Sequence, residues 1–126
     1  MKGESLLRQR RPNEARDAFV EALGCLEPFE DAAAVQQAGV ARAGLVIAHV
    51  RVGALAQARQ VAESSADSAS PEMTLARIEL MLAEGKRRAA LGALVSLEAE
   101  AEPHMLRTTD ATRRWHGLPP RAEKTP

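Results

Sequence analysis

The chain has 126 residues, with 17 basic and 17 acidic side chains, and only 2% of its residues are aromatic. The balanced charge gives no overall field toward nucleic acid or an anionic membrane, and the shortage of aromatic residues disfavours a β-sheet. Because Ala, Leu, Glu and Arg are strong helix formers and are abundant here, the sequence predicts a single all-α domain.

Prolines and glycines divide the chain into predicted helices. Proline is favoured at the first position of a helix, and glycine in the turn that follows one. Pro12 and Pro71 mark helix starts, and Gly53 and Gly85 mark turns. "SADSAS", residues 65–70, has the composition of a loop. The predicted helices cover residues 3–10, 12–26, 30–52, 54–65, 71–84, 86–102 and 104–115.

The third predicted helix contains the longest apolar run of the sequence, "AGLVIAHV". This run is apolar nearly all round, which is typical of a helix buried between several neighbours. It is much shorter than the ~18 residues that a membrane span needs. From residue 116 onward the apolar content is too low to predict order, so we expect a loose tail over 116–126.

Three segments of the chain repeat one pattern, in which an alanine follows a turn residue by five positions and a proline ends the segment. The turn residues are Arg10, Gly53 and Gly85. The alanines are Ala15, Ala58 and Ala90, and the prolines are Pro28, Pro71 and Pro103. Small residues at these positions allow two helices to approach at the short end of the usual 8–10 Å range.

A helix-turn-helix repeat of about 34 residues with this pattern resembles the tetratricopeptide family. The family's aromatic residue, one turn after the alanine, is matched by Phe19, and its glycine on the first helix by Gly3. The resemblance implies a short right-handed α-solenoid of about three hairpins over residues 1–103. A helix over 104–115 would cap it, before the tail over 116–126. An ordinary bundle of alanine-rich helices is the alternative.

The titratable and nucleophilic side chains form no recognisable catalytic or metal-binding motif. His49, His104 and His116 have no ligand-type residue at i+3 or i+4, and Cys25 lacks a basic neighbour, which predicts a packed thiol. No glycine-rich phosphate loop is present. We therefore expect a non-enzyme without a metal or cofactor, and the basic clusters, with no aromatic platform, predict solvated turns rather than nucleic-acid binding. A single cysteine and no signal peptide favour the cytoplasm.

The resemblance implies that the first helix of each hairpin faces a concave surface that binds a protein segment. Arg51 and Glu79 are expected to be solvent-accessible, because burying an unpaired charge is unfavourable. The predicted partner-binding residues are Leu7, Arg8, Ile47, Val50, Arg51, Leu75, Glu79 and Leu82.

These features predict a non-catalytic protein–protein interaction module, a scaffold, adaptor or chaperone-like protein, that binds an apolar peptide or amphipathic helix. A fragment of a larger transcriptional or signalling regulator, with its effector domain elsewhere, is the alternative. The arginine-rich, lysine-poor composition is typical of a GC-rich genome and favours a bacterial source.

Overall fold

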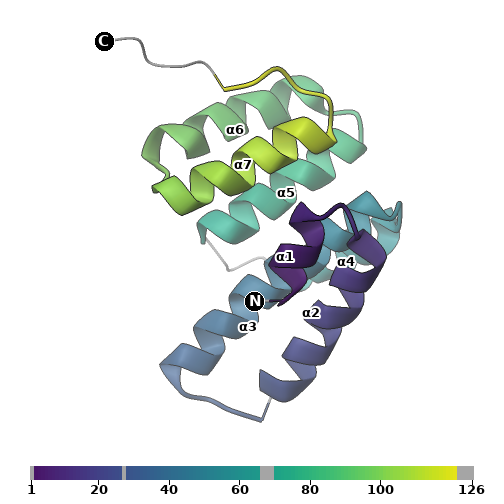
Figure 1. Cartoon of the computed structure of the whole chain (residues 1–126), viewed down its shortest axis with the longest axis vertical. Helices are drawn as coiled ribbons and strands as arrows, with labels where there is room; N and C mark the ends of the chain where they lie inside the picture. The colour runs from purple at the N-terminus through teal and green to yellow at the C-terminus, as the bar shows by residue number, and fades with distance from the viewer. Residues whose placement is uncertain (1, 27, 66–69, 122–126) are drawn as a thin grey trace.

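The computed structural model describes residues 2–26, 28–65 and 70–121, and within them it contains seven α-helices and no strand (Figure 1). The all-α prediction is confirmed, and each predicted helix is present within two residues of its expected ends. Most of the predicted loop 65–70 lies outside the described residues. The helices are α1 (Lys2–Arg8), α2 (Pro12–Leu26), α3 (Ala32–Arg51), α4 (Leu55–Ser64), α5 (Pro71–Ala83), α6 (Arg87–Glu100) and α7 (Pro103–Trp115).

Local capping explains where several helices begin. The carboxylate of Asp31 accepts a hydrogen bond of 2.8 Å from the backbone N–H of Ala34 at the start of α3. The hydroxyl of Ser70 accepts one of 3.2 Å from Met73 at the start of α5. Such caps satisfy backbone donors that have no partner within the helix. Asp31 therefore begins α3 two residues later than the sequence pattern indicated.

Within the described residues, four helices end in the same kind of turn, in which one residue adopts a left-handed backbone conformation. Its φ is 59° at Arg10, 84° at Gly53, 83° at Gly85 and 68° at Gly117. In each turn the next residue donates its backbone N–H to a carbonyl five positions earlier, as in a Schellman motif. These bonds are Arg11 to Leu6, Ala54 to His49, Lys86 to Met81 and Leu118 to Arg113, at 2.8–2.9 Å.

The hydrophobic core consists of three clusters that follow one another along the chain. The first joins α1, α2 and α3, the second α3, α4 and α5, and the third α5, α6, α7 and Leu118. In the first cluster, Phe19 of α2 is fully buried between two glycines. A Cβ on Gly3 would lie 2.7 Å from the Phe19 ring, and one on Gly44 would overlap it. Both glycines are therefore required for helix packing.

The alanines of the repeated pattern occupy buried positions on α2, α4 and α6. Ala15, Ala58 and Ala90 each have no exposed surface. The side chain of alanine is a single methyl group. Because of this, α2, α4 and α6 can each lie close to the helices beside them.

The start of the predicted tail is not loose. Leu118 is buried in the third cluster, and Arg121 forms an ion pair with Asp110 at 3.3 Å. His116 also makes a buried contact, described below. The tail prediction is wrong for residues 116–121, because the apolar side chain of Leu118 and the polar contacts of His116, Pro119 and Arg121 anchor them. Residues 122–126 lie outside the described residues.

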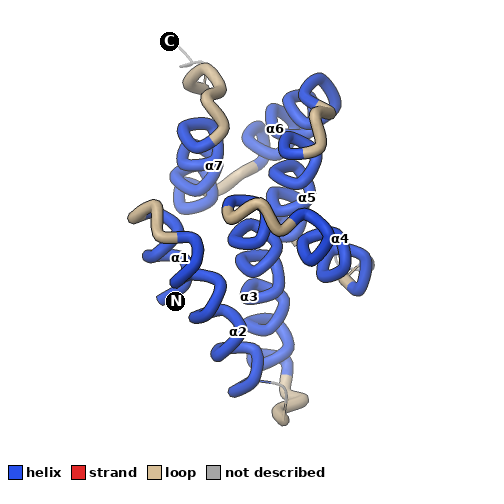
Figure 2. Tube along the Cα trace, turned by 90° about the vertical axis from the view of Figure 1, so that its right-hand side faces the viewer, coloured by secondary structure: helices blue, strands red, loops and turns tan. Residues whose placement is uncertain are grey.

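The odd-numbered helices share one face of the molecule. Figure 2 shows α1 and α7 on the same side, α4 on the opposite side, and α3 and α5 between them. In this arrangement α1 lies beside α3, and α7 lies beside α5.

Candidate functional site

A groove of about 110 Å³ lies where α1, α3, α5 and α7 meet. Its wall and floor are mainly apolar, and Glu4, Arg8, Glu72 and His104 contribute charged or polar groups at the rim. A concave apolar surface with a few polar groups is the usual form of a binding site. The apolar lining residues include Leu7, Val40, Ala43, Ile47, Leu75 and Met105.

Five of the eight predicted partner-binding residues line this groove: Leu7, Arg8, Ile47, Arg51 and Leu75. The other three do not line it. Val50 is buried in the cluster between α3, α4 and α5, and Leu82 packs, half-buried, against the cluster of α5, α6 and α7. Glu79 is buried completely beneath the surface.

The expectation that Arg51 and Glu79 are solvent-accessible is wrong. The side chain of Glu79 is 0% exposed and that of Arg51 is 4% exposed. They form a bidentate ion pair, with Arg51 Nη2 2.7 Å from Glu79 Oε2 and Nε 3.1 Å from Oε1. Each charge is buried because the other pairs with it, so the argument against unpaired burial does not apply.

Two further donors complete the environment of Glu79. The hydroxyl of Thr112 donates to Oε2 at 3.0 Å, and His116 Nε2 donates to Oε1 at 2.8 Å. Together with the two bonds from Arg51, these fill the acceptor capacity of the carboxylate. The Glu79 cluster (Arg51, Glu79, Thr112 and His116) therefore ties α3 and α5 to α7 and to the turn that follows it.

The surroundings of Glu79 favour its charged form. Burial alone would raise its pKa, but the hydrogen bond from His116 and the charge of Arg51 outweigh burial, so the pKa of Glu79 is lowered from its ordinary value. The carboxylate is thus held ionised and fully occupied by partners within the chain.

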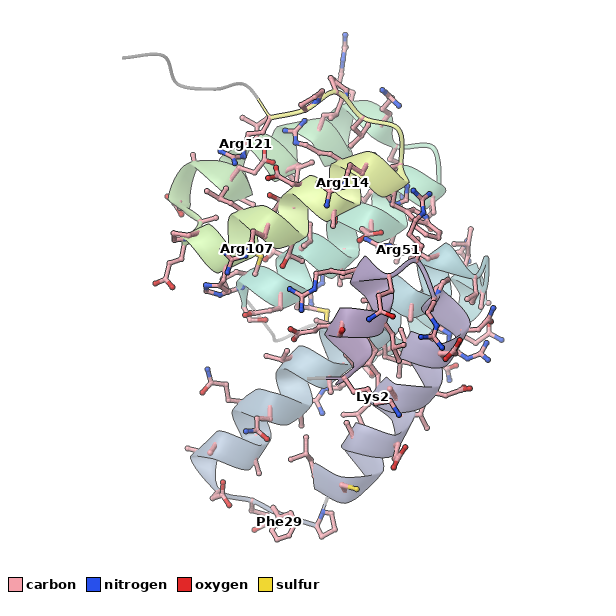
Figure 3. The ribbon with its side chains drawn as sticks, viewed as in Figure 1. Lys2, Phe29, Arg51, Arg107, Arg114 and Arg121 are labelled. Atoms are coloured by element: carbon pink, nitrogen blue, oxygen red, sulfur yellow. The ribbon has the colours of Figure 1, made fainter. Side chains whose placement is uncertain are left out.

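The ring of Trp115 is close to two arginines, Arg51 and Arg10. The guanidinium carbon of Arg51 is 5.0 Å from the centre of the Trp115 ring, and that of Arg10 is 4.9 Å from it. Both distances are within the range of cation–π attraction. Because Arg10 belongs to the turn between α1 and α2, this stack joins the beginning of the fold to α7. Figure 3 shows Arg51 near the C-terminal end of α7.

A second buried ion pair fastens α7 to α6. Arg113 Nε is 2.8 Å from Glu98 Oε2, and its Nη1 donates to the carbonyl of Pro119 at 2.9 Å. The hydrogen bond to Glu98 raises the pKa of Arg113 above its ordinary value, against the opposite effect of burial. The position of α7, and with it one wall of the groove, is therefore fixed by charged contacts as well as by apolar packing.

Sequence reasoning missed the residues that complete the Glu79 cluster. Thr112 was not singled out, and His116 was assigned to the tail. The prediction of a packed thiol at Cys25 is also wrong, because this cysteine is exposed near the end of α2. The sequence offers one signal for the cluster, the free-energy cost of burying the charge of Arg51 or of Glu79 without a partner. That cost predicted that both side chains face solvent, and it did not predict that they pair with each other.

The groove contains few groups for chemistry. In the parts of the chain that the structure describes, no three His, Cys, Asp or Glu side chains are arranged to hold a metal ion. No helix within the same residues combines the length and apolar character needed to cross a membrane.

Comparisons of the chain with protein-family models, with curated proteins and with solved structures gave no match.

Proposed function

We propose that the helices form a short right-handed α-solenoid of tetratricopeptide-like hairpins. The spacing of the last three left-handed turns supports this, because 32 residues separate Gly53 from Gly85 and also Gly85 from Gly117, whereas 43 separate Arg10 from Gly53. The family's period is about 34 residues. The pairs α1/α2, α3/α4 and α5/α6 are each joined by such a turn, so α1, α3 and α5 are first helices of successive hairpins and α7 follows them in register.

In this solenoid α7 is a capping helix. Arg107, Asp110 and Arg114 lie ten, seven and three residues before Gly117, and α5 has apolar residues at the equivalent positions before its own turn. A terminal unit with a polar outer face is what keeps an α-solenoid soluble. Figure 3 shows Arg107 and Arg114 on the outer side of α7. The equivalent residues of α5 are Leu75, Ile78 and Leu82.

The function that the fold supports best is non-catalytic binding of an apolar protein segment. The observation that carries this proposal is the groove, because it is built by the three first helices together with α7 and combines an apolar floor with a charged rim. An amphipathic helix binds such a groove through apolar side chains one turn apart. The chain then acts as a scaffold, adaptor or chaperone-like module.

A pair of variants on α7 tests this function. Thr108 is exposed and lines the groove, so Thr108→Trp should fill the groove without disturbing the core. Arg107→Trp, one residue earlier on the outer side of α7, is the matched control. Proteins captured from an extract of the source organism by the wild type and by Arg107→Trp, but not by Thr108→Trp, are groove partners. The same captured proteins for all three would contradict the proposal.

A further inference from the structure

Arg8 is a charged residue at the rim of the groove. Its side chain is exposed and lines the groove beside Leu7. Within residues 2–26, 28–65 and 70–121, it forms neither a hydrogen bond nor an ion pair. The guanidinium therefore has all its donors available on the side where an occupant of the groove would lie.

The turns place Arg8 and Arg51 at equivalent positions. Arg8 lies two residues before Arg10, and Arg51 lies two residues before Gly53, the left-handed residue of its own turn. Arg51 receives a carboxylate from the next first helix, α5, where Glu79 lies six residues before the turn.

The helix next to Arg8 supplies no such carboxylate. The residue of α3 that lies six positions before Gly53 is Ile47, which also lines the groove. Arg8 thus has the apolar residue Ile47 at the position where Arg51 has the acid Glu79. The guanidinium of Arg8 therefore lies beside the apolar floor of the groove, and α3 supplies no carboxylate to pair with it.

The volume and the charges of the groove restrict which side chains its occupant can carry. The groove volume of about 110 Å³ is smaller than that of a cavity of roughly 150 Å³ that holds one benzene molecule, so aliphatic side chains fit it better than aromatic rings. Glu4 lies one helical turn before Arg8, and Glu72 lines the groove from α5. An acidic group is therefore favoured only at the Arg8 end, where the planar fork of the guanidinium can bind a carboxylate through two bonds.

We propose that the occupant of the groove is an amphipathic helix of another protein that carries a carboxylate one turn from an aliphatic anchor. The anchor packs on Ile47 and Leu75, and the carboxylate pairs with Arg8 as Glu79 pairs with Arg51. This inference rests on the proposed function, since it specifies the partner of the same groove.

Three synthetic helices test the preference for an acid. Each is an acetylated and amidated peptide with leucines at i, i+3, i+4 and i+7. The three differ only at position i+8, one turn after the leucine at i+4, which is Glu, Gln or Lys. The measurements are the methyl chemical shifts of Ile47 and Met105, which line the groove, and the dissociation constants from titration. We expect the Glu peptide to bind about threefold to fivefold more tightly than the Gln peptide at low salt, and the difference to shrink at high salt.

Arg8→Gln should abolish the difference between the Glu and Gln peptides. Arg88→Gln is the matched control, because Arg88 is exposed on α6 and does not line the groove. Equal binding of all three peptides at the groove methyls would overturn the acid preference and leave the proposed function standing. Tightest binding of the Lys peptide would show that Glu4 and Glu72 dominate, which also overturns the inference. No methyl shift with any peptide would overturn the proposed function as well.

Discussion

Glu79→Ala should be among the most destabilising single substitutions in this protein. It leaves the guanidinium of Arg51, whose side chain is 4% exposed, without its counter-charge, and it removes the acceptor of Thr112 and His116. Breaking a buried ion pair by removing one partner costs about 3–5 kcal/mol. A domain of ordinary stability has about 5–15 kcal/mol in total, so the variant loses a large share of its free energy of unfolding.

The assay is a urea or thermal melt followed by circular dichroism. For a chain of this length, a loss of 3–5 kcal/mol lowers the melting temperature by roughly 10–20 °C. Glu84→Ala is the control, because the ion pair of Glu84 with Arg59 is at the surface, where the arginine side chain is 49% exposed. Such a pair contributes at most about 1 kcal/mol. Equal melting temperatures for Glu79→Ala and Glu84→Ala would refute the reasoning.

The double variant Glu79→Ala with Arg51→Met distinguishes two causes of instability, the loss of the ion pair and the loss of side-chain volume at position 79. It removes the uncompensated guanidinium, so it should be more stable than Glu79→Ala alone. A double variant as unstable as the single one would show that the ion pair is not the cause.

Acid should remove the contribution of Glu79 in a defined range. Because its pKa in the folded protein is lower than the ordinary value of 4.5, the stabilisation is complete above about pH 4.5 and is lost as the pH falls through the lowered pKa. The difference between the wild type and Glu79→Ala should therefore shrink in acid, and a constant difference down to strongly acidic pH would contradict the assignment.

Three other substitutions test the packing and a second titrating group. Ala90→Leu should destabilise the fold by about 1–3 kcal/mol in a denaturant melt, because Ala90 is fully buried, whereas Ala89→Leu, on the exposed side of α6, should change little. Gly44→Ala should destabilise it to a similar extent, about 1–3 kcal/mol, since the new Cβ would overlap the ring of Phe19, and a melt equal to that of the wild type would contradict the packing. Burial lowers the pKa of His49 from its ordinary value of 6.5, so the unfolded chain binds the proton more readily and stability falls as the pH drops below about 6.5. His49→Gln should flatten that part of the stability profile, and an unchanged profile would exclude the assignment.

The helices could be predicted from the sequence because their signals are local. Pro12, Pro71, Gly53 and Gly85 mark starts and turns through backbone preferences that do not depend on the rest of the fold. Helix ends that depend on a particular side chain, such as the Asp31 cap, were placed less accurately.

The groove could be predicted only in part, for a different reason. Leu7, Ile47 and Leu75 are implied by the resemblance to the tetratricopeptide family, which places the first helix of each hairpin on a concave surface. The pairing of Arg51 with Glu79 joins residues 28 positions apart, and nothing in the local sequence distinguishes a surface charge from one that meets its partner across two helices. Long-range electrostatic contacts of this kind become visible only when the helices are placed in space.

Arg10 couples the two ends of the described chain in its folding. A left-handed backbone costs a non-glycine residue roughly 1–2 kcal/mol, and the other three turns avoid this with glycine. The contact of Arg10 with Trp115 offsets that strain only when α7 is in place. In a linear stack of hairpins the terminal units can fray on their own. Here loss of α7 also weakens the first turn, so unfolding should be cooperative from end to end, with amide protons of α1 and α7 exchanging at similar rates.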